Sequence, residues 1–290
     1  MSEAGSVVDL RLHDGRTLAA RTYGKDDASP LLFFHGAPGA RSFHWSPTAL
    51  HEFRFHQICF DRSGYGASTP HPGRDLATVA SDAIELLDAL GIESCTAAGW
   101  SAGGRFAIAL AALAPERVRS LALVAARGPL FEIPGELERM DAGERGLLDL
   151  AAQDAQALID LLLPFYQGWV DDPSSFMGDA PAPDATVLGD GQFGRVWHTS
   201  LREAFAQGGE AMVWDLLTHY MPWPCDTSAV HAPTAVFRGG LDQVVGPASA
   251  EWFESALPVV VNVVWPELAH LAVLPAERQI LAMMRSIEGE

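Results

Sequence analysis

A single serine, Ser101, stands between two glycines in the stretch CTAAGWSAGGRF, which covers residues 95–106. The pattern Gly-x-Ser-x-Gly, formed with Gly99 and Gly103, allows a turn so sharp that only small residues fit two positions before and after the serine. A serine hydroxyl attacks a carbonyl carbon only when a base takes its proton and N–H donors stabilise the resulting oxyanion. The pattern therefore indicates acyl transfer, provided that such partners lie nearby.

Three fixed positions out of five recur by chance, so the weight of this pattern depends on the elements around it. The run SCTAAGW, residues 94–100, is typical of a buried strand. The run AGGRFAIALAALA, residues 102–114, is apolar nearly all round and ends before Pro115, as a buried helix would. A strand followed at once by a helix is the context that places a serine at the carboxyl edge of a sheet.

Strand-like and helical segments alternate along much of the chain, which predicts an α/β class with a mostly parallel sheet. Asp14–Gly15 favours a hairpin turn, so an antiparallel pair is expected first. A helix is expected over residues 75–90, before Gly91. Further strands are expected over residues 30–36, 56–64, 117–126, 233–240 and 259–265, with helices over 247–257 and after Leu274.

The alternation of strand-like and helical segments stops between about Phe131 and Cys225. Strand-like runs disappear there, and residues 146–163 carry a helical stripe of apolar residues. Residues 179–191 are expected to form a loop, and the acidic segments 170–175 and 179–184 a solvated surface. This divides the chain into a first core part (1–130), a helical cap (131–228) and a second core part (229–290).

Two further motifs stand in order before the serine, HGAPG at residues 35–39 and DRSGYGAS at residues 61–68. Together with the Ser101 turn they make the chain resemble the serine-nucleophile branch of the α/β-hydrolase superfamily. The resemblance spans about residues 6–128 and 232–287. It implies an eight-stranded, mostly parallel sheet flanked by helices, with the helical cap as an insertion. It also implies an oxyanion hole formed by the backbone N–H groups of Ala37 and Ala102.

In that superfamily the catalytic residues follow the chain order serine, acid, histidine. His270 comes after the strand expected at 259–265 and before the last helix, so it is the expected base. Asp242 follows the strand expected at 233–240 and matches the usual position of the acid. Glu132 and Asp226 are alternative acids.

Ten histidines compete for the role of base, so position must decide among them. His219 and His231 lie in or beside the insertion and follow no strand end. His35 lies in the HGAPG loop, where the resemblance implies that it orders the loop. Position along the chain therefore favours His270.

The resemblance implies a serine hydrolase that cleaves a carboxylic ester or a lactone through an acyl-enzyme, with a Ser101–His270–Asp242 triad. Neither a metal nor an organic cofactor is required. The aromatic residues of the insertion predict a small, mainly apolar substrate. Most of these aromatics are expected to pack, but we expect Trp100, Trp197 and Trp214 to contact the substrate.

Other activities remain open, namely thioester hydrolysis, carbon–carbon bond hydrolysis and ligand binding without turnover. Peptidase activity also stays open but ranks below esterase activity. The prolyl aminopeptidase branch shares the HG-x-PG loop, but its serine is usually followed by tryptophan where this chain has Ala102. Dehalogenases and epoxide hydrolases carry aspartate at the position of Ser101. A dinucleotide-binding domain is not expected, because no complete G-x-G-x-x-G motif follows a first strand.

The composition limits the partners. With 19 Lys and Arg against 37 Asp and Glu the net charge is −18, which argues against nucleic acid. No run is long and apolar enough for a membrane span, and the N-terminus has no leader pattern. Three cysteines that cannot all pair favour a reducing compartment. We expect a cytoplasmic monomer or homodimer that acts on a small molecule.

Overall fold

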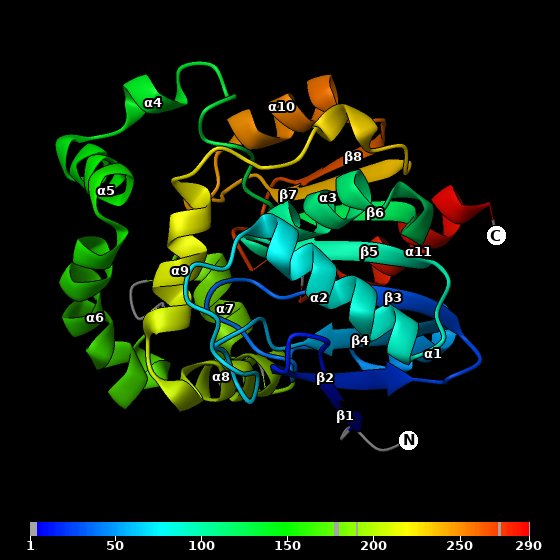
Figure 1. Ribbon diagram of the computed structural model, residues 1–290. Coiled ribbons are helices and arrows are strands. Elements are labelled where there is room, and N and C mark those ends of the chain that lie inside the picture. The colour runs from blue at the N-terminus through cyan, green and yellow to red at the C-terminus, as the bar shows by residue number, and fades with distance from the viewer. Residues whose placement is uncertain (1–4, 177–179, 190, 272–273, 290) are drawn as a thin grey trace.

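The computed structural model describes residues 5–176, 180–189, 191–271 and 274–289, and a single eight-stranded sheet lies at its centre (Figure 1). The strands are β1 (Ser6–Arg11), β2 (Thr17–Gly24), β3 (Ser29–Phe34), β4 (Phe55–Phe60), β5 (Cys95–Trp100), β6 (Val118–Val124), β7 (Thr234–Gly239) and β8 (Val259–Trp265). Their order in the sheet is β1-β2-β4-β3-β5-β6-β7-β8. The six strands from β3 to β8 run parallel, and β1 and β2 form the predicted antiparallel hairpin. The predicted α/β class is confirmed.

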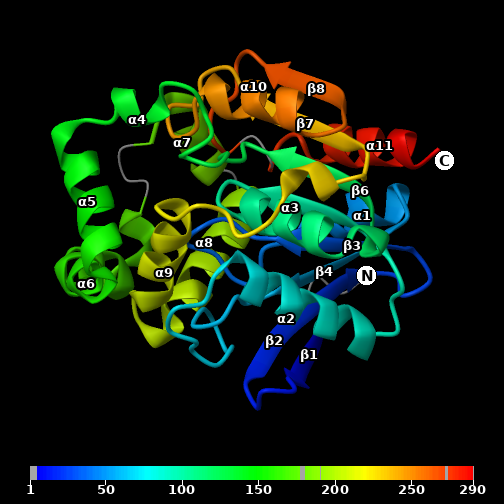
Figure 2. The same cartoon turned by 45° about the horizontal axis from the view of Figure 1, so that its top comes forward.

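Helices cover both faces of this sheet (Figures 1 and 2). One face packs against α2 (Leu76–Ala89), α3 (Gly103–Leu113) and α10 (Pro247–Ala256), and the other against α1 (Pro47–Glu52) and α11 (Glu277–Glu288). Because each face of a parallel sheet is covered, its central strands are buried along their whole length, as in β4 and β5.

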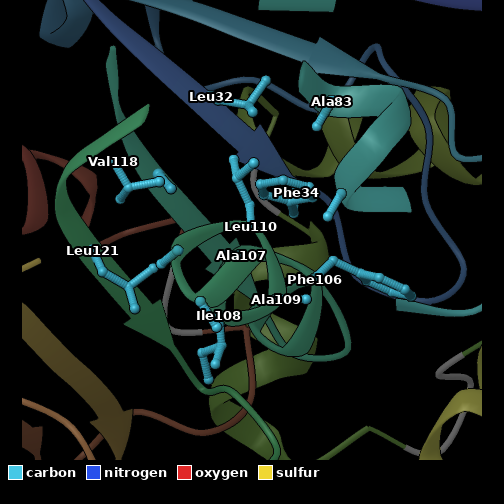
Figure 3. Close-up of a cluster of buried hydrophobic side chains, with 14 of the residues drawn as sticks. Leu32, Phe34, Ala83, Phe106, Ala107, Ile108, Ala109, Leu110, Val118 and Leu121 are labelled. Carbon is cyan, nitrogen blue, oxygen red and sulfur yellow. The ribbon is translucent and has the colours of Figure 1, made fainter. Parts of the chain in front are cut away.

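The two long helices beside the central strands follow their sequence patterns. α2 buries the predicted stripe from Leu76 to Leu87, and Asp75 caps its first turn by accepting from the backbone N–H of Thr78 at 2.7 Å. α3 is buried nearly all round, and Figure 3 shows Phe106, Ile108 and Leu110 among the packed side chains of this core. Buried on every side, α3 holds its first residues firmly at the edge of the sheet.

Within the described residues, six α-helices lie between β6 and β7 in the sequence, and we call them the inserted helices. They are α4 (Glu136–Arg139), α5 (Ala142–Gln153), α6 (Ala155–Asp171), α7 (Ala182–Gly189), α8 (Phe193–Ala204) and α9 (Glu210–His219). In both views α4, α5 and α6 form an arm set apart from the sheet, with α8 and α9 between the arm and the sheet (Figures 1 and 2). In the part of the chain that the structure describes, no helix has the length and apolar character to cross a membrane.

The loop predicted over residues 179–191 is wrong for most of its length, because α7 fills residues 182–189. Asp179 and Asp190 lie outside the described residues. The prolines suggested a loop, yet Pro183 lies in the first turn of α7, where a missing N–H costs no hydrogen bond. The expected solvated surface over 179–184 is also wrong at Asp184, which is 1% exposed.

Candidate active site

The turn at Ser101 joins β5 to α3 at the carboxyl edge of the sheet. Ser101 has φ of 55°, a left-handed conformation that residues with side chains rarely adopt. The flanking glycines are required sterically, since a Cβ on Gly103 would lie 2.0 Å from the carbonyl oxygen of Phe34 and one on Gly99 would lie 2.5 Å from that of Gly103. The backbone N–H of Ser101 donates to the carbonyl of Val124 at 2.9 Å, which ties the turn to β6.

Three side chains from distant parts of the chain meet at this turn. The Ser101 Oγ lies 2.9 Å from Nε2 of His270, and Nδ1 of the same ring lies 2.9 Å from Oδ2 of Asp242. Asp242 accepts only, so Nδ1 carries a proton and Nε2 is free to accept from the serine hydroxyl. Both partner side chains are shielded from water, at 7% exposure for His270 and 1% for Asp242.

The loops that carry His270 and Asp242 are fixed by their own contacts. Asp242 follows β7, and its Oδ1 accepts from the backbone N–H groups of Val244 and Val245, each at 2.8 Å. His270 follows β8, and its carbonyl accepts from the Trp100 indole N–H at 3.1 Å. Because β5, β7 and β8 run parallel, their carboxyl ends bring all three side chains to one edge.

Ala37 and Ala102 line the same cavity as Ser101. Within the described residues the backbone N–H groups of Ala37 and Ala102 have no hydrogen-bond partner. Ala102 directly precedes α3, whose N-terminal end carries a partial positive charge. Two free N–H groups beside one hydroxyl are the arrangement that an oxyanion requires.

Arg62 holds the loop that carries Ala37 in place through hydrogen bonds to its backbone. The guanidinium donates to the carbonyl of His35 at 2.6 Å and to that of Gly36 at 2.9 Å. Nδ1 of His35 donates to the Gly36 carbonyl at 2.7 Å, and burial together with Arg62 keeps the pKa of His35 well below its usual value. His35 is therefore a neutral ring that orders the loop.

Arg62 is anchored in turn by a buried ion cluster around Asp215 of α9. Oδ2 of Asp215 lies 2.5 Å from Arg62 and accepts from the Tyr65 hydroxyl at 3.0 Å, and Oδ1 lies 2.7 Å from Arg74. Burial alone would raise the pKa of Asp215, but Arg62 and Arg74 outweigh it and hold that pKa far below its usual value. The cluster connects the inserted helices to the loop that carries Ala37.

A second carboxylate from the inserted helices supports the histidine. Asp184 of α7 accepts from the backbone N–H of His270 at 3.1 Å and from that of Leu271 at 2.9 Å. Burial raises the pKa of Asp184, and these two N–H groups only partly offset it. α7 therefore fixes the backbone on which His270 is carried.

The predicted tryptophans lie away from the cavity beside Ser101. Trp100 is 2% exposed and stacks on Phe43, and Trp197 packs edge-on against Trp100. Trp214 packs at the buried cluster, beside Arg74. None of the three rings lines the cavity beside Ser101, and Trp214 lines a separate cavity with Leu76 and Pro222. Contact of these tryptophans with a substrate stays a prediction. The aromatic side chains at the cavity wall are Tyr166 and Tyr220.

The alternative acids and bases lie outside the hydrogen-bonded set at Ser101. Glu132 is exposed, and Asp226 is exposed and accepts from the backbone N–H of Ser228 at 2.9 Å. His231 is exposed, whereas His219 is buried in the cavity wall. Among the described side chains there is no group of three or more metal-ligating residues.

The sequence did not predict the roles of three residues that shape this site. Arg62 stands inside the quoted DRSGYGAS motif, so its position was visible although its role was not. Asp184 and Asp215 lie in the insertion, and no spacing in the sequence relates them to the residues they contact. Only the folded chain pairs them.

Comparisons with known proteins agree with this fold. Residues 29–276 match the family model described as alpha/beta hydrolase fold. The chain is 29% identical over 255 residues to a non-heme chloroperoxidase of Streptomyces lividans, covering 84% of this chain and 87% of that protein. It is 37% identical over 119 residues to an uncharacterized hydrolase, YcgS, of Bacillus subtilis, covering 41% of each.

A further relative is 3-oxoadipate enol-lactonase 1 of Acinetobacter baylyi, 26% identical over 180 residues that cover 62% of this chain and 63% of that protein. The chain thus spans less than two thirds of the length of YcgS and of this lactonase.

Solved structures show the same fold at low identity. A hydrolase from Pseudomonas aeruginosa superposes with a TM-score of 0.74 at 23% identity, covering 99% of this chain and 100% of that one. An esterase from Exiguobacterium antarcticum gives 0.69 at 18% identity, covering 98% and 100%. The family model spans most of the chain, and the chain therefore belongs to the alpha/beta hydrolase fold family.

Proposed function

We propose that this protein is a serine hydrolase that cleaves a carboxylic ester or a lactone of a small molecule through an acyl-enzyme. The observation that carries the proposal is the continuous hydrogen-bonded series from Asp242 through His270 to Ser101, with 2.9 Å at each step. The lactonase and esterase among the similar proteins favour the same bond type. The inserted helices would act as a cap that closes over the substrate.

The first half-reaction forms the acyl-enzyme. His270 Nε2 takes the proton of Ser101 as Oγ bonds to the carbonyl carbon, and the carbonyl oxygen becomes an oxyanion. The N–H groups of Ala37 and Ala102 donate to that oxyanion, and Asp242 stabilises the imidazolium. The carbon–oxygen bond to the leaving group then breaks, and the departing oxygen takes the proton from Nε2.

The second half-reaction releases the acid. A water gives a proton to His270 Nε2 and adds to the acyl carbon, which forms a second oxyanion in the same place. The bond to Ser101 Oγ breaks, and Oγ takes the proton back from Nε2. For a lactone the leaving hydroxyl stays on the product, so the net change is the addition of one water.

The substrate differs from the sequence-based expectation in one respect. The aromatic residues of the insertion favoured a mainly apolar substrate, but three arginines and several carboxylates line the cavity beside Ser101. The ring of Tyr166 and the side chains of Leu130 and Met212 supply an apolar part of the wall. A small ester or lactone with both an apolar and a polar part suits this lining.

The proposal is tested by treating the protein with a fluorophosphonate probe, locating the adduct by mass spectrometry, and measuring hydrolysis of 4-nitrophenyl esters of different acyl length. We expect the adduct on Ser101 and none on the Ser101→Ala variant. The exposed Ser228→Ala variant is the matched control and should be labelled and turn over as the wild type does. Labelling at another residue would reject Ser101 as the nucleophile.

His270→Ala separates catalysis from folding. Loss of the base is expected to lower kcat by at least about 1,000-fold. The melting temperature should stay within a few degrees, because the variant leaves the carbonyl at residue 270 to accept from Trp100. Full activity in this variant would eliminate His270 as the base.

In the wild type, a labelled Ser101 without turnover of any ester or lactone would favour a ligand-binding role.

A further inference from the structure

The cavity beside Ser101 is about 380 Å³ and reaches from the Ser101 turn to the arm of inserted helices. One wall carries Ser101, Ala37 and Ala102, which are the groups that the proposed reaction uses. Another wall carries Arg105 and Arg127 with His219. The proposed reaction gives none of these three side chains a role.

Arg105 lies on α3, four residues after Ser101, and is 5% exposed. Its Nη1 donates to the carbonyl of Asp215 and to the hydroxyl of Thr218, both at 3.2 Å. Within the described residues its Nε and Nη2 have no hydrogen-bond partner, and no carboxylate forms an ion pair with it. The Nε–Nη2 edge of a guanidinium is the edge that matches the two oxygens of a carboxylate.

A buried charge without a counter-ion is costly unless something compensates it. Burial lowers the pKa of Arg105 to about 9, and the nearby Asp215 offsets only part of that effect. The side chain nonetheless projects into this cavity rather than to the surface. An anionic ligand would supply the missing counter-charge.

Arg127 adds a second cation on the same wall. It is half-buried, its Nη2 donates to the carbonyl of Val244, and its Nη1 lies 3.5 Å from Nε2 of His219. Burial, with Arg105 and Arg127, keeps the pKa of His219 well below its usual value, so Nε2 of this neutral ring accepts from Arg127. No described carboxylate lies within ion-pair distance of Arg127.

The carboxylates in the lining do not neutralise this wall. Asp215 turns its carboxylate to Arg62 and Arg74 and offers Arg105 only its carbonyl. The other two belong to the arm of inserted helices, where Glu136 pairs with Arg139 at 2.8 Å and Glu144 closes the capping box of α5. The wall at Arg105 and Arg127 therefore keeps an excess of positive charge.

We propose that Arg105 and Arg127 form a subsite for a carboxylate on the substrate, with the ester or lactone carbonyl at Ser101. This inference rests on the proposed function and names its substrate class, a half-ester or lactone that carries a second, free carboxylate. Arg105 binds the two carboxylate oxygens through its Nε–Nη2 edge, and the nearby positive charge of Arg127 adds electrostatic attraction. Neutral esters of the same size fill the cavity but leave both cations unpaired.

The test compares the 4-nitrophenyl half-esters of succinate, glutarate and adipate with the neutral methyl 4-nitrophenyl diesters of the same acids, after subtraction of the enzyme-free rate. We expect the best half-ester to exceed its neutral diester in kcat/KM by about tenfold or more. Free glutarate should inhibit competitively. Equal or lower kcat/KM for every half-ester, with Ser101 labelled and neutral esters cleaved, overturns the subsite and leaves the proposed function standing.

Variants assign the preference to residues. Arg105→Gln should lower the half-ester preference to about twofold or less and weaken inhibition by glutarate. Arg127→Gln, at a half-buried position, should lower the half-ester preference by a smaller factor. It is the alternative test of the subsite if Arg105→Gln does not fold. Arg202→Gln is the matched control, since it removes one exposed charge from α8 away from this wall.

Two outcomes separate the subsite from the chemistry. A preference that survives in both Arg105→Gln and Arg127→Gln overturns the subsite, whatever the turnover. If Ser101 is not labelled and no ester is cleaved, the proposed function fails, and calorimetric titration with glutarate then decides the subsite. Binding to the wild type that is lost in Arg105→Gln supports it, and absence of binding to the wild type overturns it.

Discussion

α7 and α9 each send one carboxylate from the inserted helices to the edge of the sheet, and the two meet opposite surroundings. Asp184 and Asp215 are equally buried, at 1% exposure each. Asp215 faces two guanidinium groups, and its pKa is held far below the usual value despite burial. Asp184 faces two backbone N–H groups and, among the described side chains, no cation in direct contact, and burial raises its pKa.

The difference indicates that a low exposed fraction alone does not set the direction of the pKa shift of a buried acid. A full positive charge offsets the loss of water, whereas backbone dipoles offset only part of it. Asp215 therefore anchors the loop of Ala37 through Arg62 at any ordinary pH. Asp184 holds the loop of His270 through two backbone hydrogen bonds, and its ionisation lowers the stability of the fold.

Asp215→Asn should give the largest loss of stability. It leaves the Arg62 and Arg74 guanidinium groups buried without a counter-ion, which costs about 3–5 kcal/mol. Urea denaturation at pH 7 measures the difference. The exposed Glu210→Gln on the same helix is the control and should change the free energy of unfolding by less than about 0.5 kcal/mol.

The pH dependence of that difference identifies the charge as its source. Because the pKa of Asp215 is lower in the folded than in the unfolded chain, its contribution is fully present above the unfolded value of about 4. It is lost as the pH falls further, toward the folded pKa. A gap between wild type and Asp215→Asn that stays constant from pH 7 to pH 3 would contradict the ion-cluster account.

Asp184→Asn should change stability less and with the opposite dependence on pH. Its pKa is raised by folding, so ionisation of Asp184 costs stability as the pH rises from about 4 through the raised value. The advantage of the wild type over Asp184→Asn should therefore shrink toward neutral pH, where the two differ by about 1 kcal/mol or less. Urea denaturation at pH 4, 5.5 and 7 follows this trend.

Catalysis gives a second measure of the same variant. The asparagine amide cannot accept a hydrogen bond through its nitrogen, so one of the two backbone N–H groups loses its partner and the His270 backbone is less well fixed. We expect kcat to fall by about tenfold with a smaller change in KM. An unchanged kcat would reduce Asp184 to a purely structural contact.

Local pattern was enough to predict the strands, the helices α2, α3, α10 and α11, and the position of the Ser101 turn, but not α1. The turn requires Gly99 and Gly103 for steric reasons that act within a few residues, and such requirements are visible in the sequence. His270 and Asp242 were located from the chain order of the superfamily that the sequence resembles, together with their places after strands. Parallel strands end at one edge, so topology places the two loops together.

The contacts of the inserted helices could not be predicted in the same way. Asp184 looked like a solvated loop residue just after two prolines, because no local signal shows that α7 packs against the His270 loop. Aromatic content likewise does not tell which rings face the cavity beside Ser101 and which fill the core. Arg105 reads in the sequence as one polar residue in an apolar helix, and only the cavity shows where it points.

Trp100→Phe should lower kcat less than Asp184→Asn does. It removes one neutral hydrogen bond, from the indole N–H to the His270 carbonyl, and keeps an aromatic ring against Phe43. A net loss of about 1 kcal/mol is expected, with kcat lowered about threefold or less. Melting curves and steady-state kinetics on the same preparation check both values. A loss of kcat larger than that in Asp184→Asn would reverse the order of the two supports.

Gln207→Ala should have the smallest effect and tests whether polar contacts without charge hold the inserted helices in place. The Gln207 side chain donates to the carbonyls of Gly66 and Ser68 at 2.8 and 2.9 Å, bridging from beside α9 to the turn after β4. This partly exposed contact is neutral, so its loss leaves acceptors that water can satisfy, and about 0.5–1 kcal/mol is expected. Urea denaturation of Gln207→Ala and Asp215→Asn under the same conditions compares the two links. A loss for Gln207→Ala that equals the loss for Asp215→Asn would mean that the buried charges add nothing beyond ordinary hydrogen bonds.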